Sequence, residues 1–94
     1  MKAYFDSEAN AVSIDLLAVE CWDDGDEFDE YYCTVAFSKG RLANIGLLYP
    51  SEKLHLLEAV AKSYNLDANS LLTAAKAALA APDQTVTISD QVAA

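Results

Sequence analysis

The residues of this chain that could do chemistry gather in one acidic segment, from position 20 to position 30. The segment reads ECWDDGDEFDE and holds seven of the fifteen acidic residues. Carboxylates can bind Ca²⁺, but the spacing of an EF-hand loop, with its glycine and its later glutamate, is absent. Aromatic anchors within a polar rim are typical of partner-binding surfaces. We therefore predict a contact surface made of Trp22, Asp23, Asp24, Asp26, Glu27, Phe28, Asp29 and Glu30.

No set of residues in the sequence predicts a catalytic centre. His55 is the single histidine. A general base needs a nucleophile and an orienting group within hydrogen-bond reach, and no motif supplies them. A phosphate-binding loop, a nucleophile elbow and a dinucleotide fingerprint are all absent, and the chain has three glycines. We expect a non-enzyme with no catalytic residues, no metal ligands and no cofactor.

The two cysteines and the hydropathy pattern indicate the compartment. Cys21 and Cys33 lie twelve residues apart and form no metal-binding motif. Buried free thiols suit a reducing cytoplasm, and a disulfide across a hairpin is the alternative. No apolar run reaches membrane-spanning length, and Met1-Lys2 leads directly into a strand pattern rather than a signal peptide. We therefore predict a cytoplasmic protein without a membrane partner.

The charge balance restricts the partners. Six lysines and arginines against fifteen acids give a formal net charge of −9. This charge repels a phosphate backbone, so nucleic-acid binding is disfavoured and a basic protein partner is favoured. The identity of that partner stays open. Imitation of nucleic acid, with carboxylates in place of phosphates, is a narrower form of the same hypothesis.

The stretch YYCTVAFSKGRLANIGLLY, which follows the acidic segment, reads as a β-hairpin. We predict a three-residue loop at positions 38–40, with its glycine in a left-handed conformation. This loop pairs Val35 with Ala43 and Cys33 with Ile45, which keeps one face apolar. A two-residue turn would mix the two faces. The acidic segment itself is predicted as a loop, because its charge density opposes strand pairing.

The remaining elements follow from alternation and capping signals. Strands are predicted at 2–6 and 11–19, joined by a polar turn. Helices follow, the first with Ser51 as N-cap and Asn65 as left-handed C-cap, and the second at 68–81 with Asp67 as N-cap and Pro82 beyond its end. A last strand is predicted at 84–89.

Together these elements predict one α+β domain over residues 1–94. An antiparallel β-meander of two hairpins, ββββ, occupies 2–49, an αα hairpin occupies 51–81, and the last strand returns to the sheet or pairs with a second copy. The second helix is rich in alanine and offers little area for burial. We therefore expect a homodimer.

Two segments resemble a known family. FDSEANAVSIDL at 5–16 and GRLANIGLLYPS at 40–51 are similar to two motifs of a short bacterial family, domain of unknown function 2283. The matching residues are Asp6, Glu8, Ala9, Ala11, Ile14, Leu16, Gly40, Arg41, Ile45, Leu48 and Ser51. The departures are Ser7, Asn10, Asn44 and Gly46, where the family has Pro, Asp, Gly and Glu. The resemblance covers the first half of the chain and implies a small β-rich fold, sometimes encoded beside toxin–antitoxin-like genes, with no established activity.

The sequence thus favours a small acidic bacterial or phage protein that acts by protein–protein interaction, in an antitoxin-like or regulatory role. One alternative is a DNA-associated regulator that uses the helical pair, or a nucleic-acid-mimicking inhibitor. The second helix, however, has few side chains that could bind the edge of a DNA base, namely Asn69, Ser70, Thr73 and Lys76. The other alternative is a binder of a divalent metal or a small ligand.

Overall fold

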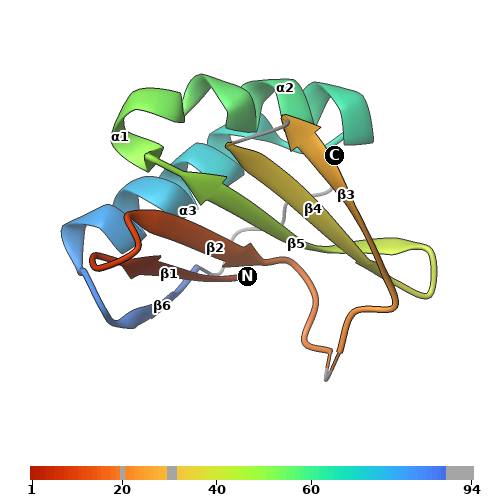
Figure 1. Cartoon of the computed structure of the whole chain (residues 1–94), viewed down its shortest axis with the longest axis horizontal. Helices are drawn as coiled ribbons and strands as arrows, with labels where there is room; N and C mark the ends of the chain where they lie inside the picture. Colours follow the sequence, from red (N-terminus) through yellow and green to blue (C-terminus); the bar gives the residue numbers. More distant parts are fainter. Residues whose placement is uncertain (20, 30–31, 89–94) are drawn as a thin grey trace.

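A computed structural model describes residues 1–19, 21–29 and 32–88. Within these residues an antiparallel six-stranded sheet carries three helices on one face (Figure 1). The strands are β1 (Lys2–Asp6), β2 (Ala11–Asp15), β3 (Asp24–Asp29), β4 (Cys33–Ser38), β5 (Arg41–Leu48) and β6 (Thr85–Thr87), and the helices are α1 (Pro50–Lys53), α2 (His55–Tyr64) and α3 (Ala68–Ala80). The predicted α+β class is confirmed.

The strand order in the sheet is β3-β4-β5-β2-β1-β6. The two predicted hairpins form, but β2 pairs with β5 instead of with the next strand, so the sheet is not a simple meander. This pairing aligns Ile14 with Ile45 and Val12 with Leu47, and all four side chains are buried. β6 returns to the sheet beside β1, which is one of the two predicted outcomes.

Most of the acidic segment is a strand, so the loop prediction was wrong there. Residues 24–29 pair with β4, with an irregularity between Glu27 and Asp29. β3 is an edge strand, and Asp24, Asp26 and Glu27 are exposed. Their carboxylates stay in water while the backbone bonds to a partner strand, CTVAFS, that carries no acid. Charge density therefore does not oppose this pairing.

The β4–β5 turn also differs from the prediction. Lys39 and Gly40 form a two-residue turn with φ of 52° and 79°, the positive values that a type I′ turn requires. A bulge then leaves Ala43 without a Cα partner in β4 and returns the apolar side chains to one face. The Cα partners are Ser38 and Arg41, Phe37 and Leu42, Ala36 and Asn44, Val35 and Ile45, and Cys33 and Leu47.

The helix ends follow local signals, with one correction. Ser51 is not an N-cap: Tyr49 holds that position at φ 50°, and Pro50 is the first residue of α1. Asn65 is left-handed as predicted, and its N–H donates to the Ala61 carbonyl. The Asp67 carboxylate accepts the N–H of Asn69 at 3.2 Å and caps α3, also as predicted.

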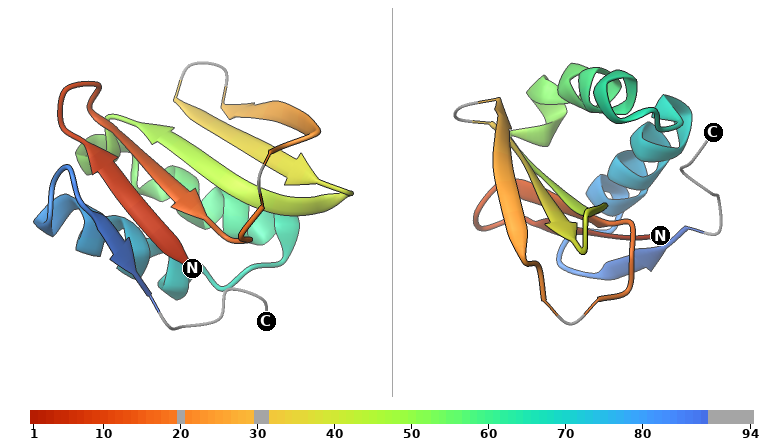
Figure 2. Two further views of the ribbon diagram at one scale, coloured as in Figure 1. Left: turned by 90° about the horizontal axis from the view of Figure 1, so that it is seen from below. Right: turned by 90° about the vertical axis from the view of Figure 1, so that its right-hand side faces the viewer.

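The core lies between the helices and one face of the sheet (Figure 2). Ala74, Ala75 and Ala78 of α3 are fully buried within the chain, in the core cluster that includes Ala3 and Ile14. Small side chains let α3 approach the sheet closely. Packing within one chain therefore accounts for the alanine-rich face that suggested a homodimer, and the homodimer stays a prediction.

Candidate functional site

The side chains on the helix-free face of the sheet are the candidate site. Because successive side chains of a strand point to opposite faces, the residues beside the buried ones lie on this face. Its exposed large apolar side chains include Tyr4 of β1, which is 37% exposed, and Leu48 of β5, which is 40% exposed. Trp22, before β3, is 53% exposed. A face of this kind carries apolar groups that no described part of the chain covers.

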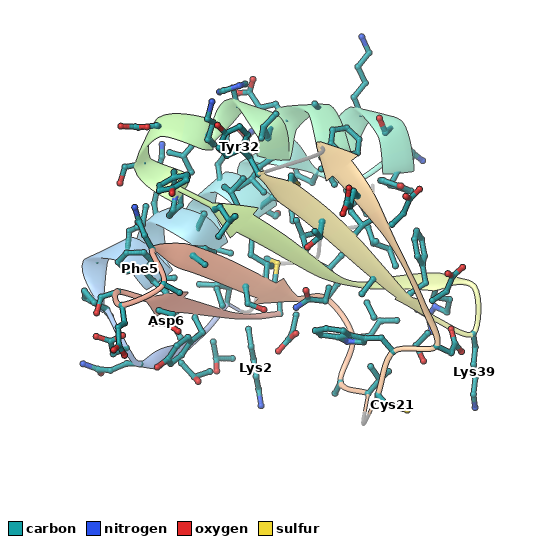
Figure 3. The ribbon with its side chains drawn as sticks, in the orientation of Figure 1. Lys2, Phe5, Asp6, Cys21, Tyr32 and Lys39 are labelled. Carbon is teal, nitrogen blue, oxygen red and sulfur yellow. The ribbon has the colours of Figure 1, made fainter. Side chains whose placement is uncertain are left out.

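A hollow of about 610 Å³, which we term the central hollow, lies on this face. It reaches from β1 to β3 and is lined by Tyr4, Asp6, Ala11, Val12, Ser13, Glu27, Tyr32, Thr34, Gly46, Leu47 and Leu48. Among the described residues, this lining contains two carboxylates, Asp6 on β1 and Glu27 on β3, and no lysine or arginine. Lys39 lies apart from it, at the tip of the β4–β5 hairpin (Figure 3). The side chains in the middle of the central hollow are therefore small or apolar, and one carboxylate lies at each of two sides.

Gly46 sets the depth of the central hollow. It lies between Ser13 of β2 and Thr34 of β4 in the register of the sheet. A Cβ atom at position 46 would lie 2.8 Å from the Thr34 Oγ1 atom, closer than such atoms approach in proteins. Only a glycine therefore allows Thr34 to keep this position. Because position 46 has no side chain, the central hollow is deeper there.

Tyr32 forms one wall of the central hollow and is held by its neighbours. Its ring centroid lies 6.0 Å from that of Tyr49, edge to face. The Lys53 Nζ atom lies 4.3 Å from the same ring centroid, on the α1 side. Both contacts stabilise an aromatic side chain, and a cation over a ring adds about 0.5–1 kcal/mol at exposed sites. The wall is therefore preorganised.

A second hollow of about 650 Å³ adjoins the central one, because Glu27 and Thr34 line both. We term it the acidic hollow. Its other lining residues are Trp22, Asp23, Asp24, Gly25, Asp26, Val35 and Ala36. Trp22 also lines a third hollow with Asp15, on the β2 side. Trp22 therefore shares a hollow with each neighbour of Asn44 in the sheet, Asp15 on one side and Ala36 on the other.

Asn44 connects the strands beneath this face. It is 5% exposed, and its Nδ2 atom donates to the Ser13 Oγ atom at 2.8 Å and to the Asp15 Oδ1 atom at 2.7 Å. A buried amide with both donors satisfied stabilises the sheet, whereas an unsatisfied one would cost about 1–3 kcal/mol. Asn44, Ser13 and Asp15 therefore form a hydrogen-bonded row between the hollows, and we assign this row a structural role.

Three carboxylates of the acidic segment bind nearby backbone N–H groups. Asp24 accepts from Gly25 at 2.9 Å, and Asp26 accepts from Glu27 at 2.8 Å. The Asp23 Oδ2 atom accepts the Lys39 N–H at 2.8 Å, across the β3–β4 pair. These bonds hold the turn of the β4–β5 hairpin and engage N–H groups of an edge strand.

The structure brings together five of the eight predicted contact residues: Trp22, Asp23, Asp24, Asp26 and Glu27 line the acidic hollow. Phe28 does not join them, because its ring packs 6.4 Å from that of Tyr64 on the helix side. Asp29 lies in β3 without a described side chain, and Glu30 lies outside the described residues.

Sequence reasoning missed the central hollow. Its lining comes from five strands, and the available signal was the alternation that separates Tyr4 and Asp6 from Ala3, and Gly46 and Leu48 from Ile45.

The other candidate chemistry finds no support in the described part of the chain. His55 is exposed on α2. No group of three or more His, Cys, Asp or Glu residues among those described could hold a metal ion. Both cysteines are thiols and do not form a disulfide; Cys33 is buried as predicted, but Cys21 is exposed, in the loop before β3. No described helix is both long and apolar enough to cross a membrane.

Comparisons with protein-family models, with curated proteins and with solved structures each find no match to this chain. The resemblance to the short bacterial family therefore stays a prediction.

Proposed function

We propose that this protein is a non-enzymatic interaction module that binds another protein through the helix-free face of its sheet. The observation that supports this most is that Tyr4 and Leu48 line the central hollow and Trp22 lines the adjoining acidic hollow, each of them more than a third exposed. Apolar patches with a polar rim are typical of protein-binding sites, since such area is costly to leave in water. A cytoplasmic regulatory or antitoxin-like role fits such a module.

The charge supports a basic partner. The net charge is −9, and five acids line the acidic hollow or the central hollow; of those in β3, Glu27 shares the helix-free face with Thr34, whereas Asp24 and Asp26 share the other face with Phe37 and Val35. These five acids are Asp6, Asp23, Asp24, Asp26 and Glu27. Complementary charge speeds encounter and selects the partner more than it adds affinity. A second copy carries the same charge, so a homodimer through this face is disfavoured.

DNA binding through the helical pair is less well supported. α3 turns Leu71, Ala75 and Ala78 into the core, which leaves Asn69, Thr73 and Lys76 exposed. Neutralisation of DNA phosphates needs lysines or arginines, and the whole chain has six of them. We therefore assign the helical pair a role in forming the hydrophobic core and not in binding DNA.

The test is an affinity capture from nuclease-treated host lysate with two matched variants. Leu48→Lys changes the helix-free face, and Thr73→Lys adds the same charge on α3. We expect the partner to be lost with Leu48→Lys and kept with Thr73→Lys. Loss with Thr73→Lys alone would refute the proposal in favour of the helical pair, and retention by both variants would refute the sheet face as the contact surface.

A further inference from the structure

We infer that the central hollow binds a basic amphipathic α-helix of a partner protein, laid across the strands. This inference rests on the proposed function and adds to it the chemical class and the shape of the bound segment. Four observations support it: the length of the central hollow, the small side chains on its floor, the carboxylates at its two sides, and sheet edges that are poorly suited to adding a strand.

The extent of the central hollow fits three to four helical turns. The hollow reaches from β1 to β3, which are separated by four strand spacings. At about 4.8 Å per spacing, this distance is about 19 Å. An α-helix rises about 1.5 Å per residue, so about 13 residues span it.

The floor of the central hollow allows a helix to approach. Ala11, Ser13 and Gly46 supply its middle, and Tyr4 and Leu48 rise beside them. The opposite face of the sheet already packs a helix in a similar way, through the alanines of α3. A helix with small and medium apolar side chains on one side would cover the exposed apolar area of Tyr4 and Leu48.

The charges at the two sides of the central hollow select a basic segment. Asp6 lies at the β1 side and Glu27 at the β3 side, and no lining residue that the structure describes is a cation. The Asp6 carboxylate also accepts the N–H groups of Glu8 and Ala9, which fixes its position. A helix with lysine or arginine near both ends and an apolar stripe between them therefore matches the hollow. A second copy of this acidic chain does not.

An added β-strand is the other common occupant of a sheet, and the edges disfavour it. Strand addition needs free backbone N–H groups at an edge. At the β3 edge, Asp24 and Asp26 already engage the N–H groups of Gly25 and Glu27. At the other edge, β6 has three residues. The face of the sheet therefore offers more to a partner than its edges do.

A synthetic peptide tests the inference directly. We would titrate the full-length protein with a 15-residue helical peptide that has alanine and leucine on one side, lysine near both ends and no tryptophan. Trp22 is the single tryptophan of the chain and borders the adjoining hollow, so its emission reports binding. Two control peptides complete the set: one carries two central prolines that break the helix, and one carries glutamate in place of lysine.

Matched variants of the protein locate the binding site. Glu27→Lys and Glu58→Lys make the same charge change at exposed positions, the first in the hollow and the second on α2. We expect Glu27→Lys to weaken binding of the helical peptide about tenfold and Glu58→Lys about twofold or less. Circular dichroism would check that both variants fold.

Several results would overturn the inference. These are equal binding of the proline peptide, equal binding of the glutamate peptide, equal effects of the two variants, and no binding up to 1 mM peptide. If any of them occurs while Leu48→Lys still abolishes partner capture, the proposed function stands and only the helical occupant is wrong. If capture is also unaffected by Leu48→Lys, both fail.

Discussion

The fit between Gly46 and Thr34 makes the substitution Gly46→Ala the sharpest test of the structure. The new Cβ atom would lie 2.8 Å from the Thr34 Oγ1 atom, so one of the two strands must shift or Thr34 must leave its rotamer. Overpacking of this kind costs about 1–3 kcal/mol. Alanine also gains about 0.5–1 kcal/mol over glycine, because it loses less backbone entropy on folding. The net expectation is a loss of about 1 kcal/mol.

Two further variants separate the steric effect from the backbone effect. In a Thr34→Ala background the offending atom is gone, so Gly46→Ala should become neutral or stabilising by about 0.5 kcal/mol. Gly25→Ala is the control in the same sheet, since its Cβ atom would lie 3.4 Å from the Val35 carbonyl oxygen, an ordinary contact. It should not destabilise the protein.

The assay is urea unfolding followed by circular dichroism, analysed as a double-mutant cycle. We expect a coupling free energy of about 1–2 kcal/mol between positions 34 and 46. A loss of about 1 kcal/mol corresponds to a decrease in Tm of about 4–8 °C for a chain of this size. A coupling free energy near zero, or a Gly46→Ala variant as stable as Gly25→Ala, would refute the tight packing that defines the floor of the central hollow.

Three further predictions concern other parts of the chain. Asn44→Ala should lower the free energy of unfolding by about 1–3 kcal/mol, measured by urea unfolding, because it removes two hydrogen bonds from a buried row; a loss below about 0.3 kcal/mol would contradict this. The Ser7 hydroxyl and N–H hold the pKa of Asp83 below its usual 3.8, so its contribution to stability is present above that value and is lost as pH falls through the folded pKa. The difference in Tm between wild type and Asp83→Asn should therefore shrink on titration from pH 6 to pH 2, and a constant difference would be the contrary result. A thiol reagent should modify Cys21 in the native protein and Cys33 only after denaturation, as followed by mass spectrometry.

The parts of the fold that sequence reasoning predicted correctly depend on local signals. Asn65 and Asp67 act within a few residues of their own helix ends, and the first hairpin joins neighbouring strands through a short turn. The pairing of β2 with β5 depends instead on matching buried faces about thirty residues apart. Several registers satisfy such a match, so alternation alone does not choose between them.

β3 and the bulge beside Ala43 were missed for different physical reasons. An edge strand can keep its acids in water, so composition does not distinguish it from a loop. A bulge changes which face a residue occupies, and no residue type marks it here.

The candidate site was predicted only in part, because much of its lining depends on strand pairing between distant parts of the sequence. The acids near Trp22 are contiguous in the sequence and were visible as a cluster. The lining of the central hollow comes from five strands, and Tyr4 and Gly46 become neighbours of the same space only through the β2–β5 pairing. Composition cannot reveal such a site before the strand order is known.

The place of β1 between β2 and β6 has a consequence for how the chain acquires its structure. The first strand in the sequence finds one neighbour at once, in its own hairpin, but its other neighbour is separated from it by nearly the whole chain. Contacts of such long sequence separation slow the search for the native state, so folding slower than that of a helical bundle of this length is expected. During synthesis the N-terminal hairpin would wait with one side of β1 unpaired until residues 85–87 leave the ribosome. A chain that stops before them would keep that unpaired strand.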